Sequence, residues 1–341
     1  MVSIQKDISL KDLNNFKIGG RAKYLLKVSS VEELIEGLKQ WKKISKKSPS
    51  QDMFIFGGGT NVLVSDKGFN GLVIHNKIKE IRILGYCNLA GCTHETCEVG
   101  EAGNIKILAG AGVLLEDLLN FCVQNCLSGL EWAGGLPGTI GGAVRGNAGA
   151  FKGEIKDSAY EVESLSTYEV GNLATYEVRK RKNSECNFGY RSSIFKDGEG
   201  KSEIIISVEL KLQGGNKDLI KRQIEKKINY RKERHPLEYP NIGSIFKNIP
   251  IEKVPQKLLG GLSSSIKDDP FPILPTAKLL AVAGLKGKRQ GGAMVSEKHP
   301  NFIVNLGNAT SEDVRSLIGE IKEIIKEKYK LELEEEITYL N

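Results

Sequence analysis

The sequence predicts a globular protein of mixed helices and strands that is divided into two or three domains. The chain has 341 residues, which is long enough for more than one hydrophobic core. Hydrophobic residues make up 40% of it and charged residues 27%, as is ordinary for globular proteins. Segments with helical periodicity lie between short apolar runs that are typical of buried strands.

The helices and strands follow from capping and periodicity. Ser30 and Glu33 form a capping box, so one helix begins near residue 31. Cys122 and Cys126 are four residues apart in another helical pattern, which predicts that both are buried on one face. Residues 213–216 read as a linker and mark a domain boundary. In full, we expect helices from about residue 31 and over 114–126, 217–234 and 310–328, and strands over 54–56, 72–74, 204–212 and 331–339.

Two glycine-rich loops are the most informative feature of the chain. Residues 134–149 contain seven glycines in sixteen positions, too many for an ordinary helix or strand. A second run, Gly57 to Asn61, follows the apolar segment 54–56. Because glycine lets the backbone lie against a ligand, successive N–H groups form an anion site suited to a diphosphate. Two such loops predict an elongated ligand, a dinucleotide first of all; tight turns between strands are the alternative.

Neither loop matches a standard phosphate motif. The segment 134–142 lacks the G-x-G-x-x-G pattern and a following acidic residue, and no G-K-[ST] sequence occurs. The formal charge of +7 fits an anionic small molecule as well as nucleic acid. The basic segment 217–234 predicts a solvated helix face, or a helix end that helps to hold a phosphate. It has Tyr230 as its one aromatic residue, which disfavours nucleic-acid binding.

Membrane and metal binding are not expected. No run of 18 apolar residues occurs and the N-terminus lacks a signal-peptide pattern, so we expect a cytoplasmic protein. Cys87, Cys92, His94 and Cys97 form a cluster. Their spacing matches none of the standard zinc patterns, which favours incidental thiols over a metal site.

Several motifs, in order along the chain, carry a resemblance to a known family. They are the segments Asn15–Gly20, Gly57–Val64, Gly135–Ala143, Gly189–Phe195, Gly243–Asn248, Ala283–Gly287 and Asn301–Asn305. Together they resemble the UDP-N-acetylenolpyruvoylglucosamine reductases and span nearly the whole chain. The resemblance implies a cytoplasmic flavoenzyme of peptidoglycan synthesis, which uses NADPH to reduce UDP-N-acetylglucosamine enolpyruvate to UDP-N-acetylmuramate.

The resemblance also implies a fold and a domain division. The fold is α+β, with a two-subdomain FAD-binding part of the vanillyl-alcohol-oxidase (PCMH) type and a C-terminal α+β substrate-binding domain. The expected domains are 1–75, 76–213 and 217–341, with the terminal strand returning to the active site. Because the first glycine loop contains no histidine, FAD is expected to be non-covalent, unlike that of related oxidases. The expected partners are the UDP-sugar and NADPH, with no nucleic acid or membrane, and the expected state is a monomer.

Three side chains match the family's catalytic motifs. Ser244 is the implied proton donor to the enolate-like intermediate. The Arg191 guanidinium is suited to a carboxylate on which charge develops. Glu336 fits the pattern L-E-x-E followed by an aliphatic residue, because Ile337 comes next; the frame that begins at Leu331 instead selects Glu334.

The remaining site residues follow from the same motifs. Lys247 is also expected to stabilise the alkoxide left on Ser244. His235 stands where many relatives carry Gln or Lys, which predicts pH-dependent binding near its titration range. Residues 249–275 and 86–104 resemble insertions, and the first is a candidate lid. The expected cofactor-binding residues are Gly57, Gly58, Gly59, Thr60, Asn61, Val62, Gly135, Gly138, Thr139, Ile140, Gly141, Gly142 and Ala143, and the expected substrate-binding residues are Tyr190, Arg231, His235, Lys247, Asn248 and His299.

Overall fold

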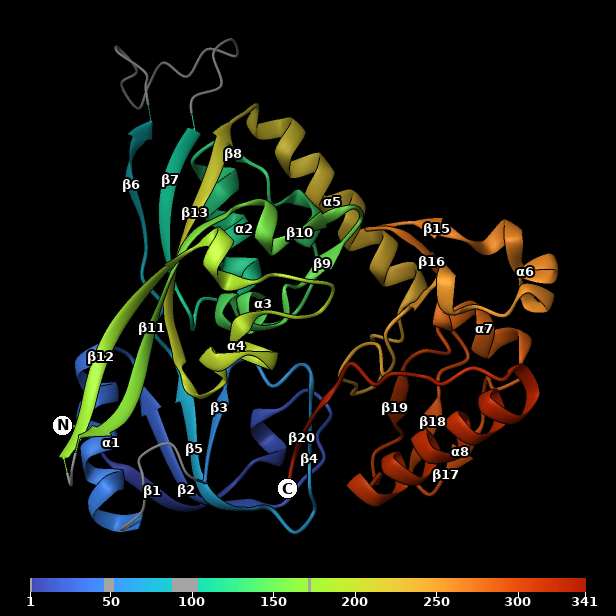
Figure 1. Ribbon diagram of the computed structural model, residues 1–341, viewed down its shortest axis with the longest axis horizontal. Helices are drawn as coiled ribbons and strands as arrows, with labels where there is room; N and C mark the ends of the chain where they lie inside the picture. Colours follow the sequence, from blue (N-terminus) through green and yellow to red (C-terminus); the bar gives the residue numbers. More distant parts are fainter. Residues whose placement is uncertain (1, 46–51, 88–103, 171–172) are drawn as a thin grey trace. The chain divides into compact units, whose positions relative to one another are not determined.

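The computed structural model describes residues 2–45, 52–87, 104–170 and 173–341 (Figure 1). These residues form two compact units, and the chain passes between them several times. The first unit comprises residues 1–6, 24–58 and 71–230, and the second comprises residues 7–23, 59–70 and 231–341. Each unit has its own hydrophobic core. The three ranges 1–75, 76–213 and 217–341 stay a prediction.

A four-stranded sheet forms the beginning of the first unit. Its strand order is β1-β2-β5-β3, and α1 covers one face through Leu34, Leu38 and Trp41. Strands β3 and β5 are parallel, so both end at the edge where the first glycine loop begins. The bounds are β1 Ile4–Ser9, β2 Arg21–Val28, α1 Val31–Ser45, β3 Met53–Phe56 and β5 Phe69–Asn76.

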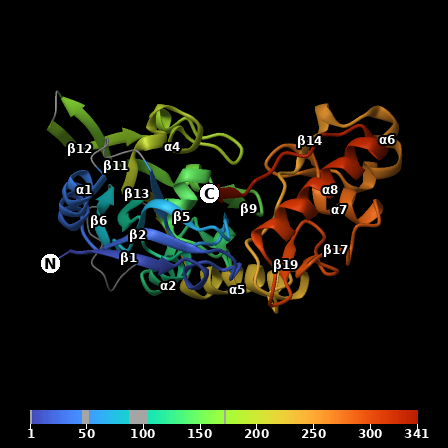
Figure 2. The ribbon, with the colours of Figure 1, turned by 90° about the horizontal axis from the view of Figure 1, so that it is seen from below.

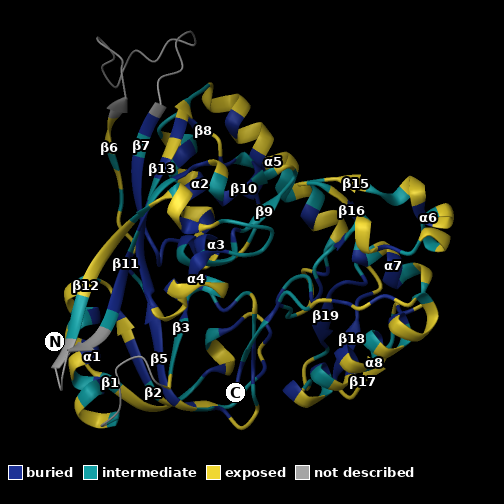
Figure 3. Ribbon diagram, viewed as in Figure 1, coloured by how far each residue is buried: buried dark blue, intermediate teal, exposed yellow. Residues whose placement is uncertain are grey.

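A larger antiparallel sheet forms the rest of the first unit. Its order is β12-β11-β13-β7-β6, with the short β8 paired to β13. The central strand β13 is mostly buried, whereas β12 exposes residues 177–180 (Figure 3). Helices α2 and α3 share the core of this sheet. The bounds are β6 Ile81–Cys87, β7 Asn104–Gly110, α2 Leu115–Gln124, β8 Leu127–Ser128, α3 Ile140–Gly146, β9 Gly149–Ala150, β10 Gly153–Glu154, β11 Ala159–Val170, β12 Leu173–Lys182, α4 Ile194–Asp197 and β13 Ile204–Gly214.

The second unit is built around α8. This helix packs against β17 and β18 of a three-stranded sheet, next to α7 (Figures 1 and 2). The segment 249–275 is ordered into a second small sheet, β14-β16-β15, with α6. Its role as a lid stays a prediction. The bounds are β4 Val62–Val64, β14 Ile249–Pro250, α6 Gln256–Leu262, β15 Lys267–Asp268, β16 Pro272–Leu274, α7 Thr276–Val282, β17 Arg289–Gln290, β18 Ala293–Val295, β19 Ile303–Asn305, α8 Ser311–Tyr329 and β20 Thr338–Leu340. Helix α5, Lys217–Arg234, belongs to the first unit as far as Tyr230.

The long helices agree with the sequence-based expectations. Helix α8 begins after Thr310, whose hydroxyl accepts the N–H of Asp313 at 3.0 Å while the Asp313 carboxylate accepts the N–H of Thr310 at 2.9 Å. At α1, the Ser30 hydroxyl accepts the N–H of Glu33, as expected. Helix α5 spans the predicted residues 217–234 and buries Ile220 and Ile224. In each case local capping and apolar spacing agree with the tertiary packing.

Four expectations were wrong in detail. Of residues 331–339, Glu335 forms an isolated bridge and only the last two begin β20, because most backbone bonds of this segment go to neighbours outside the strands. Cys126 lies beyond the end of α2 with φ of +55°, so it does not share the buried face of Cys122. Strand β13 continues to Gly214, into the expected linker. Part of the glycine-rich run folds as the helix α3.

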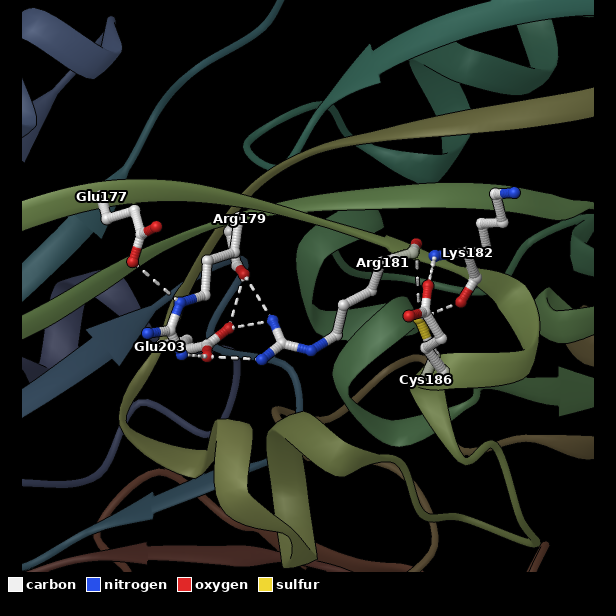
Figure 4. A network of polar contacts seen from close by, with 8 residues as sticks. Glu177, Arg179, Arg181, Lys182, Cys186 and Glu203 are labelled. Atoms are coloured by element: carbon white, nitrogen blue, oxygen red, sulfur yellow. Dashed lines mark hydrogen bonds and ion pairs between the residues drawn. The ribbon is translucent and has the colours of Figure 1, made fainter.

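A buried ion pair joins the end of β12 to Glu203, the residue directly before β13 (Figure 4). The Arg181 guanidinium donates to both Glu203 carboxylate oxygens, at 2.5 and 2.8 Å. The Ser164 hydroxyl donates to the same carboxylate at 2.6 Å. The side chains of Arg181 and Glu203 are only 11% and 3% exposed, so loss of Arg181 leaves the buried Glu203 carboxylate with the longer contact of 3.4 Å to Arg179 Nη1 as its charged partner.

Arg181→Met is therefore expected to lower the free energy of unfolding by about 3 to 5 kcal/mol. The matched control is Glu177→Gln, which removes the exposed partner of Arg179 on the same strand. We expect the control to change the free energy by less than about 1 kcal/mol. Urea unfolding followed by circular dichroism measures both. Equal losses in the two variants would contradict the assignment of this pair as a buried stabilising contact.

Candidate functional site

The first glycine loop begins where β3 ends. Phe56 lies opposite His75 in the parallel pair of β3 and β5, so the loop starts at the carboxyl edge of the sheet. A Cβ atom on Gly57 would lie 2.5 Å from the hydroxyl oxygen of Thr139. No side chain fits at that distance, so the loop backbone lies directly against the start of the second glycine-rich segment.

The N–H groups of the first loop are available to a ligand. Within the described residues, no protein acceptor takes the N–H groups of Gly58 to Asn61. Gly59 has φ of +62°, which glycine adopts without strain. Consecutive N–H groups bind phosphate oxygens, so this loop fits the diphosphate of the expected FAD.

The second segment differs from the expectation of an open row of N–H groups. Its residues 140–143 begin α3, and Thr139 caps that helix. Their N–H groups donate to the carbonyls of Val113, Ala111 and Thr139 and to the Thr139 hydroxyl. The expectation was therefore wrong for these four amides. Contacts of Gly135, Gly138 and residues 139–143 with the cofactor through other atoms stay a prediction.

Arg191 lies at the tip of a tight turn in the first unit. Gly189 and Ser192 exchange backbone hydrogen bonds of 3.1 and 3.2 Å, which leaves Tyr190 and Arg191 as the two turn residues. Arg191 has φ of +56°, an uncommon conformation that ordinary residues adopt at a cost. Its Nη2 donates to the Gly149 carbonyl at 2.9 Å, and its guanidinium lies 5.1 Å from the Tyr190 ring. The turn thus fixes both predicted site residues together.

Ser244 and Glu336 come from adjacent segments of the second unit. The N–H of Glu336 donates to the Ile245 carbonyl at 2.8 Å, and the N–H of Ile245 donates to the Asn301 carbonyl at 2.8 Å. Ser244 itself pairs with Phe302 through a backbone bridge. The structure therefore brings together two of the three predicted catalytic residues, whereas Arg191 belongs to the other unit.

The neighbours of Glu336 distinguish it from Glu334. The Glu334 carboxylate forms an ion pair with the Lys247 ammonium group, and the N–H of Lys247 donates to the Glu334 carbonyl at 2.8 Å. The Asn61 amide of the first glycine loop donates to the Glu336 carbonyl at 3.1 Å. The backbone of Glu336 is thus held at its N–H by Ile245 and at its carbonyl by Asn61.

Asn248, a predicted substrate-binding residue, accepts the N–H of Thr276, the first residue of α7, at 3.2 Å.

The two predicted histidines form one aromatic cluster with Phe302. The ring centroids of His235 and His299 are 5.3 Å apart, and Phe302 lies 4.9 and 4.7 Å from them. Burial, then the charges of His299 and Arg231, lowers the pKa of His235 to about 3. Burial likewise lowers the pKa of His299 to about 4. His235 is therefore neutral near pH 7, which contradicts the expected titration near neutral pH.

The expected thiol cluster lies largely outside the described residues. Cys87 ends β6, whereas Cys92, His94 and Cys97 fall in the segment 88–103, which the structure does not describe. Among the residues that are described, no group of three or more His, Cys, Asp or Glu side chains is placed to hold a metal ion. The described helices include none that is both long and apolar enough to cross a membrane.

Sequence reasoning missed two buried asparagines beside the site residues. The Asn301 side chain accepts the Phe246 N–H at 3.0 Å and donates to the Phe246 carbonyl at 2.8 Å, which fixes the extended segment that carries Ser244. Asn147 makes similar bonds next to the Arg191 turn. Asn301 lay in a motif that carried the resemblance, but only the packed structure shows what its amide bonds to.

Comparison with known proteins first identifies the class. Residues 22–167 match the model of an FAD-binding domain. Residues 235–340 match the model of the UDP-N-acetylenolpyruvoylglucosamine reductase C-terminal domain. The two matches together cover most of the chain, and they define a flavoprotein that carries a reductase-specific C-terminal part.

Full-length relatives identify the family. The chain is 37% identical over 328 residues to the reductase of that name from Caldanaerobacter subterraneus subsp. tengcongensis, covering 96% of this chain and 90% of the relative. It is 34% identical to that of Caldicellulosiruptor saccharolyticus, covering 99% and 92%. The crystal structure of the Thermus caldophilus enzyme aligns over both whole chains with a TM-score of 0.68 and 28% identity.

The chain belongs to the UDP-N-acetylenolpyruvoylglucosamine reductase family. This membership confirms the predicted fold class, the oxidoreductase activity and FAD as the cofactor. The first glycine loop, with its available N–H groups, is consistent with that cofactor.

The histidine cluster predicts how stability depends on pH. The lowered pKa values of His235 and His299 mean that, between about pH 4 and 6.5, the unfolded chain binds more protons than the folded one. The free energy of unfolding should therefore fall as pH falls below about 6.5, by up to about 1.4 kcal/mol per pH unit for each histidine. His235→Asn should reduce this slope in urea unfolding at pH 5 to 6.5. An unchanged slope would show that His235 already carries a proton in the folded state.

Proposed function

We propose that this chain uses NADPH and bound FAD to reduce UDP-N-acetylglucosamine enolpyruvate to UDP-N-acetylmuramate, with Arg191, Ser244 and Glu336 as its catalytic residues. The observation that carries the proposal is the match of nearly the whole chain to reductases of one family, together with an FAD-binding domain in its first half. Bound FAD supplies the hydride that it takes from NADPH. The side chains of the protein must stabilise the negative charge that then develops and donate one proton.

Arg191 is assigned to the substrate carboxylate. A guanidinium keeps its charge at any working pH and pairs with a carboxylate through two parallel N–H bonds. The left-handed backbone at Arg191 supports this role, because such conformations persist mainly where surrounding structure holds them for a purpose. Tyr190 occupies the other position of the same turn and is assigned to substrate binding.

Ser244 is assigned as the proton donor. An enolate-like carbon is far more basic than water, so a correctly placed hydroxyl can protonate it. Gly243, with φ of +84°, turns the chain immediately before Ser244. Lys247 lies three residues further on, where its ammonium group is assigned to stabilise the alkoxide that remains.

Glu336 is assigned to stabilise the enolate-like intermediate. Its closest sequence competitor, Glu334, is 62% exposed at its side chain and pairs with Lys247. Glu336 adjoins the segment of Ser244 and is also bonded to Asn61 of the cofactor loop, through its backbone in both cases. These contacts favour the motif alignment that selects Glu336 over Glu334 as the catalytic residue.

The remaining assignments concern binding and cellular context. Arg231, His235, Asn248 and His299 are assigned to the UDP-sugar. His235 and His299 share one aromatic cluster with Phe302, which supports a joint role. We further assign the chain to the cytoplasm, where it would act as a monomer in peptidoglycan precursor synthesis.

Ser244→Ala should separate the two half-reactions. NADPH should still bleach the flavin absorbance at the wild-type rate, because the hydroxyl takes no part in flavin reduction. Reoxidation by UDP-N-acetylglucosamine enolpyruvate should slow by about 100-fold to 10,000-fold, the usual range for loss of a proton donor. Anaerobic stopped-flow absorbance measures both rates. If reduction and reoxidation slow equally, Ser244 does not donate the proton.

Glu336→Gln and Glu334→Gln test the choice between the two glutamates. At saturating substrate, the reoxidation rate should fall at least about tenfold in Glu336→Gln, because a group that stabilises the transition state is changed. Glu334→Gln should stay within about threefold of the wild type, since this residue pairs with Lys247 rather than with the reacting group. The reverse order would assign the role to Glu334.

A further inference from the structure

Helix α3 and the Arg191 turn are joined by a short row of hydrogen bonds. The carbonyl of Arg145 accepts the Ser193 hydroxyl at 2.7 Å, and the carbonyl of Gly149 accepts Arg191 Nη2 at 2.9 Å. Between them, Asn147 donates through Nδ2 to the Gly189 carbonyl at 2.9 Å. Every second residue from 145 to 149 therefore bonds to the segment 189–193.

Asn147 is the central member of this row and cannot readily be replaced. It is fully buried and follows α3 directly, with φ of +42° and ψ of 59°. Its Oδ1 accepts the N–H of Lys156 at 3.1 Å while its Nδ2 donates to Gly189. Glycine, asparagine and aspartate adopt this backbone conformation most readily, and of these only asparagine also provides an amide donor and an acceptor at once.

Asn147 lies at the end of α3 that faces the Arg191 turn, opposite the end that lies against the first glycine loop. The beginning of α3 is capped by Thr139, whose hydroxyl lies against the first glycine loop at Gly57. The end of α3 carries Asn147. One short helix thus runs from the contact with Gly57 to the turn that presents Tyr190 and Arg191, and Gly57, the helix and the turn belong to the same compact unit.

We infer that Asn147 is a positioning residue that sets Arg191 relative to the flavin. The inference rests on the proposed role of Arg191. The Asn147 Nδ2 bond to the Gly189 carbonyl holds the Gly189–Ser192 turn to the end of α3, and the Oδ1 bond to the Lys156 N–H fixes the amide itself, so that the guanidinium meets the substrate carboxylate in one orientation. Loss of these bonds leaves the cofactor loops in place but lets the turn move, and small displacements of a catalytic group reduce rate strongly.

Asn147→Gly tests the inference, because glycine keeps the left-handed backbone and removes both amide bonds. In the FAD-loaded full-length protein, we expect unchanged flavin content and an unchanged rate of bleaching by NADPH. Reoxidation by UDP-N-acetylglucosamine enolpyruvate should slow by about tenfold to a hundredfold. Adding Arg191→Lys to Asn147→Gly should slow it by much less than Arg191→Lys does alone, because the two residues act as one unit.

Two further variants keep the test decisive. Ser193→Ala removes only the neighbouring bond to Arg145, so it should show the same selective loss in smaller degree even if Asn147→Gly folds poorly. Asn183→Ala removes two 2.7 Å bonds to the Lys156 and Ala159 carbonyls in the same unit. This control should lower Tm and leave reoxidation unchanged.

The outcomes separate this inference from the proposed function. Wild-type reoxidation in Asn147→Gly and Ser193→Ala, with slow reoxidation in Arg191→Lys, would overturn the positioning role alone. Equal losses of flavin content, bleaching and reoxidation would also overturn it, because they indicate a general structural role. If reduced wild-type protein is not reoxidised by the UDP-sugar, or Arg191→Lys reoxidises normally, the assigned function of the site is wrong and the inference fails with it.

Discussion

The first unit depends on two close contacts around α3, at Gly57 and at Gly141, where only glycine fits. A Cβ atom on Gly57 would meet the Thr139 hydroxyl at 2.5 Å, and one on Gly141 would meet the Ala111 Cβ at 2.8 Å. Neither position has room for a side chain, so the helix is fixed against the first glycine loop and the strand edge at once. The Arg191 turn of the same unit is bonded to the end of α3 and so depends on this placement.

The same contacts are consistent with separate roles for the first glycine loop, which would bind the cofactor, and for α3, which would position other site residues. The N–H groups of residues 140–143 are used within the protein, whereas those of Gly58 to Asn61 are available for phosphate oxygens. The first loop is thus suited to hold the cofactor, and α3 is suited to carry the framework. In the second unit, Asn301 plays a comparable part, since its buried amide fixes the segment that carries Ser244.

Elements with strong local signals could be predicted from the sequence. Helix α8 has both a capping box at Thr310 and a regular apolar stripe, and α5 keeps its predicted bounds. The segment 331–339 alternates like a strand and buries Leu331 and Leu333, yet its backbone bonds mostly to residues that lie outside the strands. Helix α3 was missed because its cap and packing override the low helix propensity of glycine. Propensity is a weak guide where tertiary contacts decide.

The site could be predicted only in part, for a related reason. Arg191, Ser244 and Glu336 were predicted through motif resemblance, not through composition or periodicity, and their catalytic roles stay a prediction. Asn147 gives no comparable signal, because an asparagine within a glycine-rich run is typical of an ordinary turn. Its importance depends on zero exposure and on bonds to residues 9 and 42 positions away. Long-range contacts of this kind are visible only in the folded chain.

The central claim is that this chain holds FAD non-covalently and passes a hydride from NADPH to an enolpyruvyl ether. The most direct test is the absorbance spectrum of the purified protein under anaerobic conditions, followed by addition of NADPH and then of UDP-N-acetylglucosamine enolpyruvate. The account predicts flavin absorbance that NADPH bleaches and the UDP-sugar restores, with free FAD released on denaturation. Colourless protein that does not take up added FAD, or reduced flavin that the UDP-sugar leaves bleached, would contradict it.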